Sequence, residues 1–253
     1  MGIFDSGVGG LSVFTGVKKA FPGLGITYLA DTKNIPYGEK TTEELIERIS
    51  NILDFFAQRQ IKTVVAACNT VGAVLLSGVP ELRRWPELAI FGVLGPAAQQ
   101  AADFDTVGVL ATTYTANSGV YEQLIHRQNP RCQVQTIGSP VFAALVEGNS
   151  NQEELRANLF PVLRRFALRP DAIVLGCTHY ACLEALVLEF WAHDIKIINS
   201  GSALLPLLRQ QLPTWVTGEN HATFYVTGEL PPFVAAASRF FAVDASTGTQ
   251  IVL

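Results

Sequence analysis

The sequence predicts an α/β protein of two similar lobes, each a mostly parallel sheet flanked by helices, with the active site in the cleft between them. Short apolar runs alternate with longer amphipathic segments, which is typical of parallel strands joined by helical crossovers. Hydrophobic residues make up 49% of the 253 residues and charged residues 16%, which suits buried strands. Two of the apolar runs end in similar cysteine-containing segments, which indicates a repeated unit.

The predicted strands are short runs rich in Ile, Val and Leu. The segments between them are longer and mix apolar with polar residues, as helical crossovers do. We expect strands at Gly2–Phe4, Gly25–Ala30, Thr63–Ala67, Ala89–Leu94, Thr106–Ala111, Ala172–Leu175 and Lys196–Ile198.

Two segments give the clearest helix patterns, Thr41–Arg59 and Gln152–Leu168. The first opens with two threonines followed by Glu43 and Glu44. Threonine can cap a helix N-terminus, and acidic side chains are stabilised beside its positive end. A helix beginning there is therefore expected.

Two segments are candidate crossings between the lobes, one around Gly95-Pro96 and one around Ser200 to Pro206. They divide the chain into a first lobe of residues 1–94 plus 206–253 and a second lobe of residues 95–205. The chain has no low-complexity tract or flexible linker, so the lobes should pack directly on one another.

Cys68 and Cys177 end the two similar runs. Thr63-Val-Val-Ala-Ala-Cys-Asn-Thr resembles Ala172-Ile-Val-Leu-Gly-Cys-Thr-His, and each is a buried strand followed by Cys and a polar residue. Ligands of parallel sheets bind at the carboxyl ends of the strands, so both thiols should lie in such a place. A buried cysteine more often packs as a small hydrophobic residue, which is the alternative for each and our interpretation of Cys132 and Cys182.

The turn after the first predicted strand, Asp5-Ser-Gly-Val-Gly-Gly, contains three glycines. It matches neither G-x-G-x-x-G, whose third glycine would fall on Ser12, nor a P-loop, because no G-K-[ST] follows. Glycines there more simply allow close backbone approach, which leaves Asp5 and Ser6 at the end of the strand. A helix N-cap is the alternative role for Asp5.

A zinc site of Cys177, His179 and Cys182 is a further alternative, but a structural zinc site needs four ligands. Cys68 or Cys132 would have to complete it from far away in sequence, so we expect no metal. His126, His193 and His221 stand in ordinary surroundings and are assigned no role in a site.

Charge and hydropathy exclude two classes of partner. The net charge is -4, with 18 basic and 22 acidic residues scattered along the chain, so nucleic acid is not expected. The apolar stretches fall short of the roughly 20 residues that span a bilayer, and no secretory signal is recognisable at the N-terminus. We therefore expect a cytoplasmic protein whose four cysteines are thiols.

Several short segments form a set of sequence blocks spread along the chain. The blocks, in order, are Phe4 to Val13, Ala30-Asp31 with Pro36-Tyr37-Gly38, Ala67 to Thr70, Val146-Glu147, Gly176 to Tyr180 and Val226-Thr227-Gly228. Together they resemble the signature blocks of the bacterial glutamate racemase family, within the aspartate/glutamate racemase superfamily. Further similarity covers Thr112 and Thr115 before Ser118-Gly119, so the resemblance spans essentially the whole chain.

The resemblance implies interconversion of L- and D-glutamate without a cofactor, which supplies D-glutamate for peptidoglycan. Inversion needs a base on one face of the α-carbon and an acid on the other, and two thiols meet this need symmetrically. By the same resemblance Cys68 deprotonates D-glutamate and Cys177 L-glutamate. Asp5 assists the first thiol and His179 the second, with Glu147 near the second.

The resemblance also implies the residues that bind glutamate, which is the expected small-molecule partner. Asn69, Thr70 and Thr178 would hold the α-carboxylate, where negative charge develops in the transition state. The γ-carboxylate would be held by Ser6 and the backbone of Tyr37-Gly38 beside Pro36. Asp5 and His179 would lie near the amino group, Thr112 and Thr115 would line the cleft, and Asp31 would be an acidic neighbour. A homodimer is the expected assembly.

Three departures from the family pattern are visible. Ala181 stands where proline is common, and Asn199 stands where aspartate is usual; neither should touch the chemistry. The chain has no N-terminal extension before its first block, so activation by a cell-wall precursor is not expected.

Two other functions remain as alternatives. A related two-cysteine racemase acting on aspartate or hydantoins would share the fold, although Pro36-Tyr37-Gly38 favours glutamate. A binding module whose lobes close on an anionic ligand would need no chemistry at all.

Overall fold

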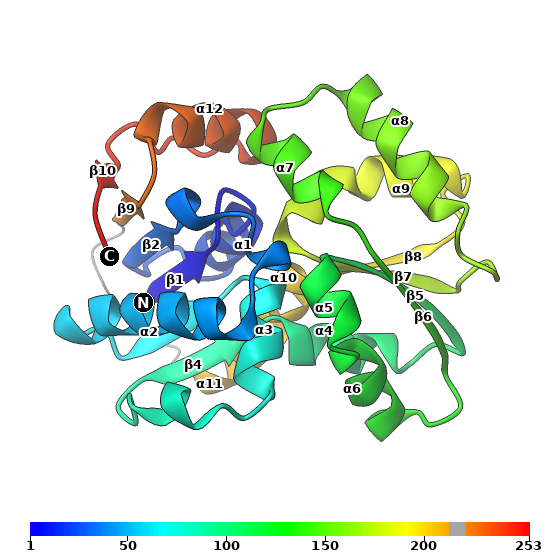
Figure 1. Ribbon diagram of the computed structural model, residues 1–253, viewed down its shortest axis with the longest axis horizontal. Coiled ribbons are helices and arrows are strands. Elements are labelled where there is room, and N and C mark those ends of the chain that lie inside the picture. Colours follow the sequence, from blue (N-terminus) through cyan, green and yellow to red (C-terminus); the bar gives the residue numbers. More distant parts are fainter. Residues whose placement is uncertain (213–220) are drawn as a thin grey trace.

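Two parallel sheets form the framework of the protein in a computed structural model that describes residues 1–212 and 221–253. The first sheet has the strand order β10-β9-β2-β1-β3-β4 and the second has β6-β5-β7-β8. Every pair of neighbouring strands runs parallel. Figure 1 shows the two sheets in the two halves of the molecule, each covered by helices, and both chain termini in the first half. The predicted fold class is confirmed.

The first sheet combines strands from both ends of the chain. Its strands are β1 (Gly2–Asp5), β2 (Ile26–Ala30), β3 (Thr63–Ala66), β4 (Ala89–Gly92), β9 (Ala222–Val226) and β10 (Thr249–Gln250). The second sheet is made from the middle of the chain, by β5 (Thr106–Ala111), β6 (Gln133–Gly138), β7 (Ala172–Gly176) and β8 (Lys196–Asn199).

Helices cover both faces of each sheet. They are α1 (Leu11–Ala20), α2 (Thr42–Gln58), α3 (Asn69–Leu76), α4 (Leu94–Ala101), α5 (Thr113–Asn117), α6 (Val120–Gln128), α7 (Val141–Glu147), α8 (Gln152–Leu163), α9 (Glu184–Phe190), α10 (Ser200–Ala203), α11 (Leu205–Gln211) and α12 (Leu230–Phe241). Short 3-10 helices lie at η1 (Thr32–Asn34), η2 (Tyr37–Glu39), η3 (Pro80–Arg83) and η4 (Thr178–Leu183).

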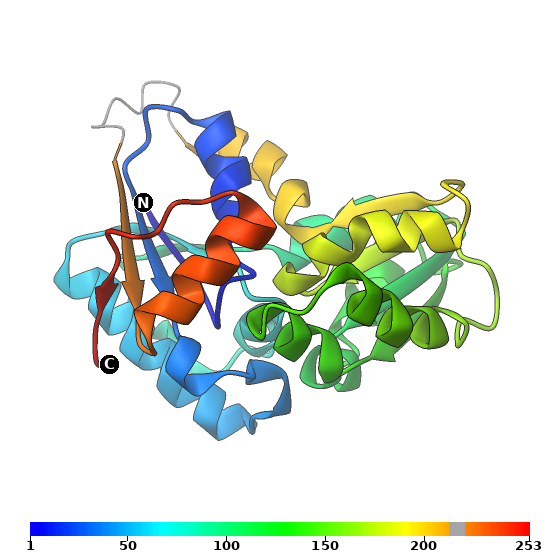
Figure 2. The same cartoon turned by 90° about the horizontal axis from the view of Figure 1, so that it is seen from above.

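The strands alternate their side chains between two apolar layers, as the period of a β-strand requires. In β1, Ile3 belongs to the layer that contains α1 and α12, whereas Phe4 belongs to the layer that contains α2 and α3. The layer around Ile3 also takes in Leu175 of β7 and Phe142 of α7, so it is continuous between the two sheets. The two halves therefore pack directly on one another, as Figure 2 shows from above.

Several boundaries differ from the sequence-based expectation. The second predicted helix ends at Leu163, not Leu168, and the strand expected to reach Leu94 ends at Gly92 because Leu94 begins α4. Gly95 and Pro96, expected at a crossing, lie in the first turn of α4, where proline is tolerated because its N–H would have no helical partner. The other expected crossing is occupied by α10 and α11.

Three strands were not expected: β6, β9 and β10. The first is Gln-Val-Gln-Thr-Ile-Gly at the edge of its sheet, half-exposed along much of its length, so it lacks an apolar run. The last has only two residues, both exposed. The first predicted helix is confirmed within a residue at each end, with a capping box between Thr41 and Glu44.

Among the described residues, no helix is long and apolar enough to cross a membrane.

Candidate active site

A cavity of about 230 Å³ lies where the carboxyl ends of strands from both sheets meet. Cys68 follows β3 of the first sheet and Cys177 follows β7 of the second, and both line the cavity. This size suits a small metabolite rather than a nucleotide, since pockets for drug-sized ligands start at roughly 300 Å³. Carboxyl ends of parallel strands are the usual place for a ligand, so the fold directs both thiols to one compartment.

Most of the residues singled out in the sequence line this cavity. They are Ser6, Pro36, Tyr37, Gly38, Cys68, Asn69, Thr70, Thr112, Glu147, Cys177, Thr178 and His179. Asp5 and Thr115 lie one layer behind the wall, each hydrogen-bonded to a lining residue.

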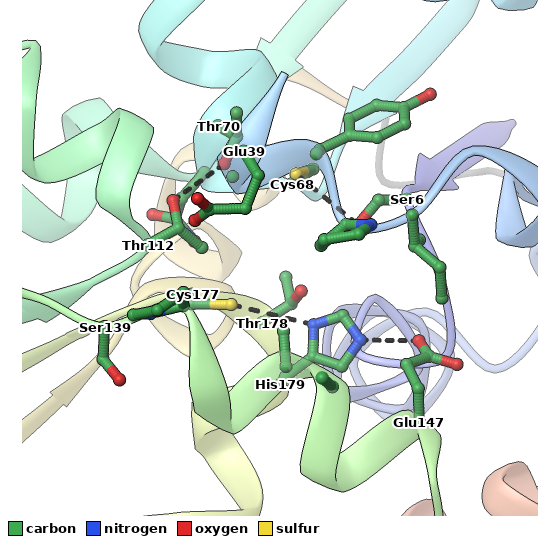
Figure 3. A pocket seen from close by; sticks show the side chains of 18 residues that line it. Ser6, Glu39, Cys68, Thr70, Thr112, Ser139, Glu147, Cys177, Thr178 and His179 are labelled. Carbon is green, nitrogen blue, oxygen red and sulfur yellow. Dashed lines mark hydrogen bonds and ion pairs between the residues drawn. The ribbon is translucent and has the colours of Figure 1, made fainter.

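The Cys177 sulfur faces a histidine. His179 Nδ1 lies 3.7 Å from Sγ of Cys177, and His179 Nε2 donates a hydrogen bond of 2.6 Å to Oε1 of Glu147. Figure 3 shows these three side chains in a row along one side of the cavity. Burial alone would lower the pKa of His179, but the hydrogen bonds to Cys177 and Glu147 outweigh it and raise the pKa well above its usual value. The ring therefore keeps its proton near neutral pH, and its Nδ1 can donate a hydrogen bond to the sulfur of Cys177.

The Cys68 sulfur has different surroundings. Its Sγ lies 4.0 Å from Oγ of Ser6, and it is the N-cap of α3. Burial, followed by the charge of Asp5, raises the pKa of the Cys68 thiol to about 12, against backbone hydrogen bonds from Val71 and Thr70 that favour the thiolate. Cys68 therefore carries its proton in the unliganded protein.

Asp5 ends β1 and is completely buried. Its Oδ2 accepts hydrogen bonds from the backbone N–H groups of Gly10 at 2.9 Å and Gly7 at 3.2 Å, and its Oδ1 accepts one from Thr178 Oγ1 at 3.2 Å. Burial raises the pKa of this carboxyl group, although the charge of His179 opposes the increase. Asp5 thus joins the glycine-rich turn to the segment after Cys177, and Gly10 is the residue that caps α1.

The glycines of this turn are required by close approach. A Cβ on Gly9 would lie 2.6 Å from the backbone nitrogen of His179, and one on Gly7 would lie 1.9 Å from Oε1 of Glu147. Both distances are far below van der Waals contact. At Gly9 the contact is with backbone, so only glycine fits, whereas a side chain at Gly7 would displace the Glu147 carboxylate from its present position. The sequence-based interpretation of the turn as a site of close backbone approach is confirmed.

Neutral donors gather at the other side of the cavity. Thr70 Oγ1 lies 3.0 Å from Thr112 Oγ1, which in turn donates to Thr115 Oγ1 at 3.0 Å. Asn69 and Thr70 form the first turn of α3, where the positive end of the helix dipole favours an anion. These groups can bind a carboxylate, although the acidic Glu39 lines the same side of the cavity (Figure 3).

The wall formed by Pro36, Tyr37 and Gly38 is anchored from behind. Tyr37 donates its hydroxyl proton to Oδ2 of the buried Asp31 at 2.6 Å, and Thr227 donates to Oδ1 of Asp31 at the same distance. Burial and the neighbouring Asp31 raise the pKa of Tyr37 well above its usual value, so the phenol remains a donor. Asp31 is therefore a neighbour of the site through Tyr37.

Six lining residues were missed by the sequence interpretation: Ile35, Glu39, Ser139, Pro140, Ala143 and Ala144. Ser139 follows β6, so recognising that strand would have placed it at a carboxyl end beside Thr112. Glu39 follows Pro36-Tyr37-Gly38 directly, and its acidic side chain could have been included with that block. Figure 3 shows Glu39 with Thr70 and Thr112 at one side of the cavity.

The zinc alternative finds no support, because no three His, Cys, Asp or Glu side chains within residues 1–212 and 221–253 gather as metal ligands. Cys132 is buried in an apolar cluster and Cys182 packs at the edge of another, which fits their interpretation as packing residues.

Two parallel sheets with two thiols at their carboxyl ends define the class of this protein as an α/β protein with a small-molecule cavity between its halves. The model of the Asp/Glu/Hydantoin racemase family matches residues 11–208, and the chain belongs to this family.

Within this family, the chain is similar to glutamate racemases both in sequence and in structure. The glutamate racemase of Pseudomonas syringae pv. tomato is 37% identical over 244 residues, covering 91% of this chain and 86% of the relative. The structure of glutamate racemase from Francisella tularensis in complex with D-glutamate superposes with a TM-score of 0.87 at 26% identity, covering 99% of this chain and 96% of that chain. Glutamate racemase from Bacillus anthracis gives a TM-score of 0.86 at 27% identity, covering 100% and 97%.

Proposed function

We propose that this protein is a glutamate racemase that interconverts L- and D-glutamate by proton transfer between Cys68 and Cys177, without a cofactor. The observation that carries the proposal is the meeting of both thiols in one cavity of a chain whose relatives are glutamate racemases. A binding module that performs no chemistry would not need two thiols at matching strand ends.

The surroundings of the two sulfurs suggest the resting state. Cys68 holds its proton, and the protonated imidazole of His179 lies beside the sulfur of Cys177. In this arrangement Cys68 would act as the acid and Cys177 as the base. This state suits L-glutamate, whose α-proton would go to Cys177 while Cys68 protonates the opposite face. After transfer, the backbone N–H groups of Thr70 and Val71 would stabilise the Cys68 thiolate, with Asp5 assisting the return of its proton.

Substrate binding follows from the donors in the cavity. Asn69, Thr70 and Thr178 are proposed to bind the α-carboxylate, where negative charge increases as the carbanion forms. Ser6 and the Tyr37-Gly38 backbone, beside Pro36, are proposed for the γ-carboxylate. Thr112 would line the same wall and Thr115 would support it from behind, while Asp5 and His179 would lie nearest the amino group.

The proposal also covers the division into lobes, the assembly, the cellular location and the biological role. We propose lobes of residues 1–94 plus 206–253 and residues 95–205, a division supported by the distribution of strands between the sheets; residues 213–220 lie outside the described structure. We further propose that the protein is a cytoplasmic homodimer that supplies D-glutamate for peptidoglycan, as the sequence resemblance implies.

The test is a circular-dichroism assay of the purified protein with L-glutamate, D-glutamate, L-aspartate and a chiral hydantoin. We expect both glutamate enantiomers to lose their signal and the other substrates to react far more slowly. Faster racemisation of aspartate would make the protein an aspartate racemase, and no reaction with any of them would reject the proposal.

A further inference from the structure

Tyr121 lies at the junction between the segments that carry the two thiols. It belongs to α6 and packs with Val109 and Val174 against one face of the second sheet, where it is 1% exposed. Its hydroxyl nevertheless reaches the first turn of α3, which follows the first sheet, and donates a hydrogen bond of 2.7 Å to Oδ1 of Asn69. A helix of one half thus holds a cavity-lining side chain of the other.

The amide of Asn69 is held from two sides. Besides the bond from Tyr121, its Nδ2 donates to Oγ of Ser200 in α10 at 3.0 Å. A primary amide has two N–H donors and one carbonyl, so one N–H of Asn69 is left for a ligand in the cavity. Two fixed partners set the direction of that N–H before any substrate arrives.

The ring of Tyr121 contacts the segment of the second thiol. A Cβ on Gly176, the residue before Cys177, would lie 3.0 Å from Cε2 of Tyr121 and 3.1 Å from the carbonyl oxygen of Leu110. The ring therefore rests against the end of β7, in a place that glycine leaves open. One side chain is in contact with the residue after Cys68 and with the residue before Cys177.

Tyr121 itself has no place in the proton transfer. It stands behind Asn69 rather than on the cavity wall. Burial, and secondarily the nearby Cys177, raise the pKa of its phenol, so the hydroxyl keeps its proton and acts as a donor.

On the basis of the proposed racemase function, we propose that Tyr121 is a positioning residue that aims the Asn69 amide at the substrate carboxylate and fixes the spacing of the two thiol segments. Because charge on the α-carboxylate grows in the transition state, a misdirected amide should lower kcat more than it raises KM.

A double-mutant cycle between Tyr121 and Asn69 tests this role. We expect Tyr121→Phe, which keeps the ring, to lower kcat/KM for glutamate about tenfold, the effect of one hydrogen bond of average strength. In an Asn69→Ala background the same substitution should change kcat/KM less than about twofold, because its target is gone. The enantiomers are equally stable, so the effect on kcat/KM must be the same in both directions.

Tyr114→Phe is the matched control. Tyr114 lies in α5 beside the second sheet and bonds Thr42 of α2 at 2.9 Å, so its substitution also removes a contact between the halves without touching Asn69. We expect it to change kcat/KM less than about twofold. If it matches Tyr121→Phe, the effect is general tethering of the halves and the proposal is wrong.

Thermal unfolding of every variant shows whether a loss of kcat/KM reflects misplaced groups or a smaller folded fraction. If Asn69→Ala does not fold, Ser200→Ala replaces it in the cycle. The losses of kcat/KM caused by Ser200→Ala and Tyr121→Phe should then be strongly non-additive, because both substitutions act on the Asn69 amide.

Two outcomes would overturn the positioning role alone. One is an equal tenfold loss of kcat/KM on Tyr121→Phe in the wild-type and Asn69→Ala backgrounds, and the other is no loss in Tyr121→Phe. A wild-type chain inactive on both enantiomers would instead reject the proposed function and this role with it.

Discussion

His179 donates a hydrogen bond of 2.6 Å from Nε2 to Oε1 of Glu147, on the side of the ring away from the sulfur of Cys177. The same carboxylate oxygen accepts the backbone N–H of Val8 at 2.6 Å, so Glu147 is itself fixed in place by the glycine-rich turn. The imidazole is thereby oriented toward Cys177 and kept protonated. The orientation and charge of this ring depend on a residue 32 positions away in the sequence.

Glu147→Gln should lower kcat/KM for glutamate about tenfold near pH 8, because a charge-assisted hydrogen bond becomes a neutral one. The pKa of His179 is raised in the folded protein, so the cation is present below that pKa and is lost as pH rises through it. Without the carboxylate this loss occurs at lower pH, and the basic limb of the kcat/KM profile should move in that direction. Glu153→Gln, at an exposed position in α8, is the control; an unmoved basic limb in Glu147→Gln would contradict the assignment.

Cys68→Ser and Cys177→Ser should each abolish racemisation, with losses of at least about 10²-fold, because a serine hydroxyl is a far weaker acid than a thiol. Circular dichroism measures racemisation, and NMR in deuterium oxide measures α-proton exchange. The double variant should have lost solvent exchange as well. Exchange at the wild-type rate in the double variant would show that neither thiol is the base.

Glu39→Gln should lower KM for glutamate about two- to fivefold at low salt. Glu39 is an exposed acid that lines the cavity, and it repels a substrate with two carboxylates. The gain should shrink above about 0.5 M salt, where charges are screened within a few ångströms. Glu43→Gln, an exposed acid outside the cavity wall, should have a smaller effect. A KM that rises in Glu39→Gln would mean that this carboxylate binds the substrate amino group instead.

The placement of both thiols at strand ends that face one cavity could be predicted from the sequence, because each follows a buried and mostly apolar strand. β3 and β7 are almost entirely buried, so their apolar runs are uninterrupted and their carboxyl ends are easy to recognise. Asp5 is similar, since it ends the buried strand β1 and precedes three glycines. Local patterns of this kind translate directly into a position at the edge of a parallel sheet.

Residues whose role arises from tertiary contacts could not be found in this way. Ser139 follows an edge strand whose residues are mostly half-exposed, so the sequence before it contains no apolar run that would indicate a strand end. Tyr121 looks like an ordinary apolar position of an amphipathic helix, and its hydroxyl acquires a role only when α6 packs beside α3. The hydrogen-bond partner of such a side chain depends on how two elements distant in sequence pack together. The periodicity of the sequence gives no information about that packing.

Thr227→Val should raise KM for glutamate and destabilise the protein, although Thr227 lies outside the cavity wall. Its hydroxyl donates to Oδ1 of Asp31 at 2.6 Å and accepts the backbone N–H of Lys33 at 3.0 Å. Valine keeps the shape but removes the hydroxyl partner of the buried Asp31 carboxylate and of the part-buried N–H of Lys33, which costs about 1–3 kcal/mol.

For a chain of this size, each kcal/mol lowers Tm by about 2–4 °C, so calorimetry should detect the loss. The same change leaves Asp31 Oδ1 with Asn34 Nδ2 at 2.9 Å as its side-chain donor, so Asp31 and the Tyr37 hydroxyl that it holds at 2.6 Å are less firmly fixed. The wall proposed to bind the γ-carboxylate is then less well anchored. Thr227→Ser retains the hydroxyl and should restore both KM and most of Tm. A valine variant with reduced Tm and unchanged KM would limit the Asp31 network to stability and separate it from substrate binding.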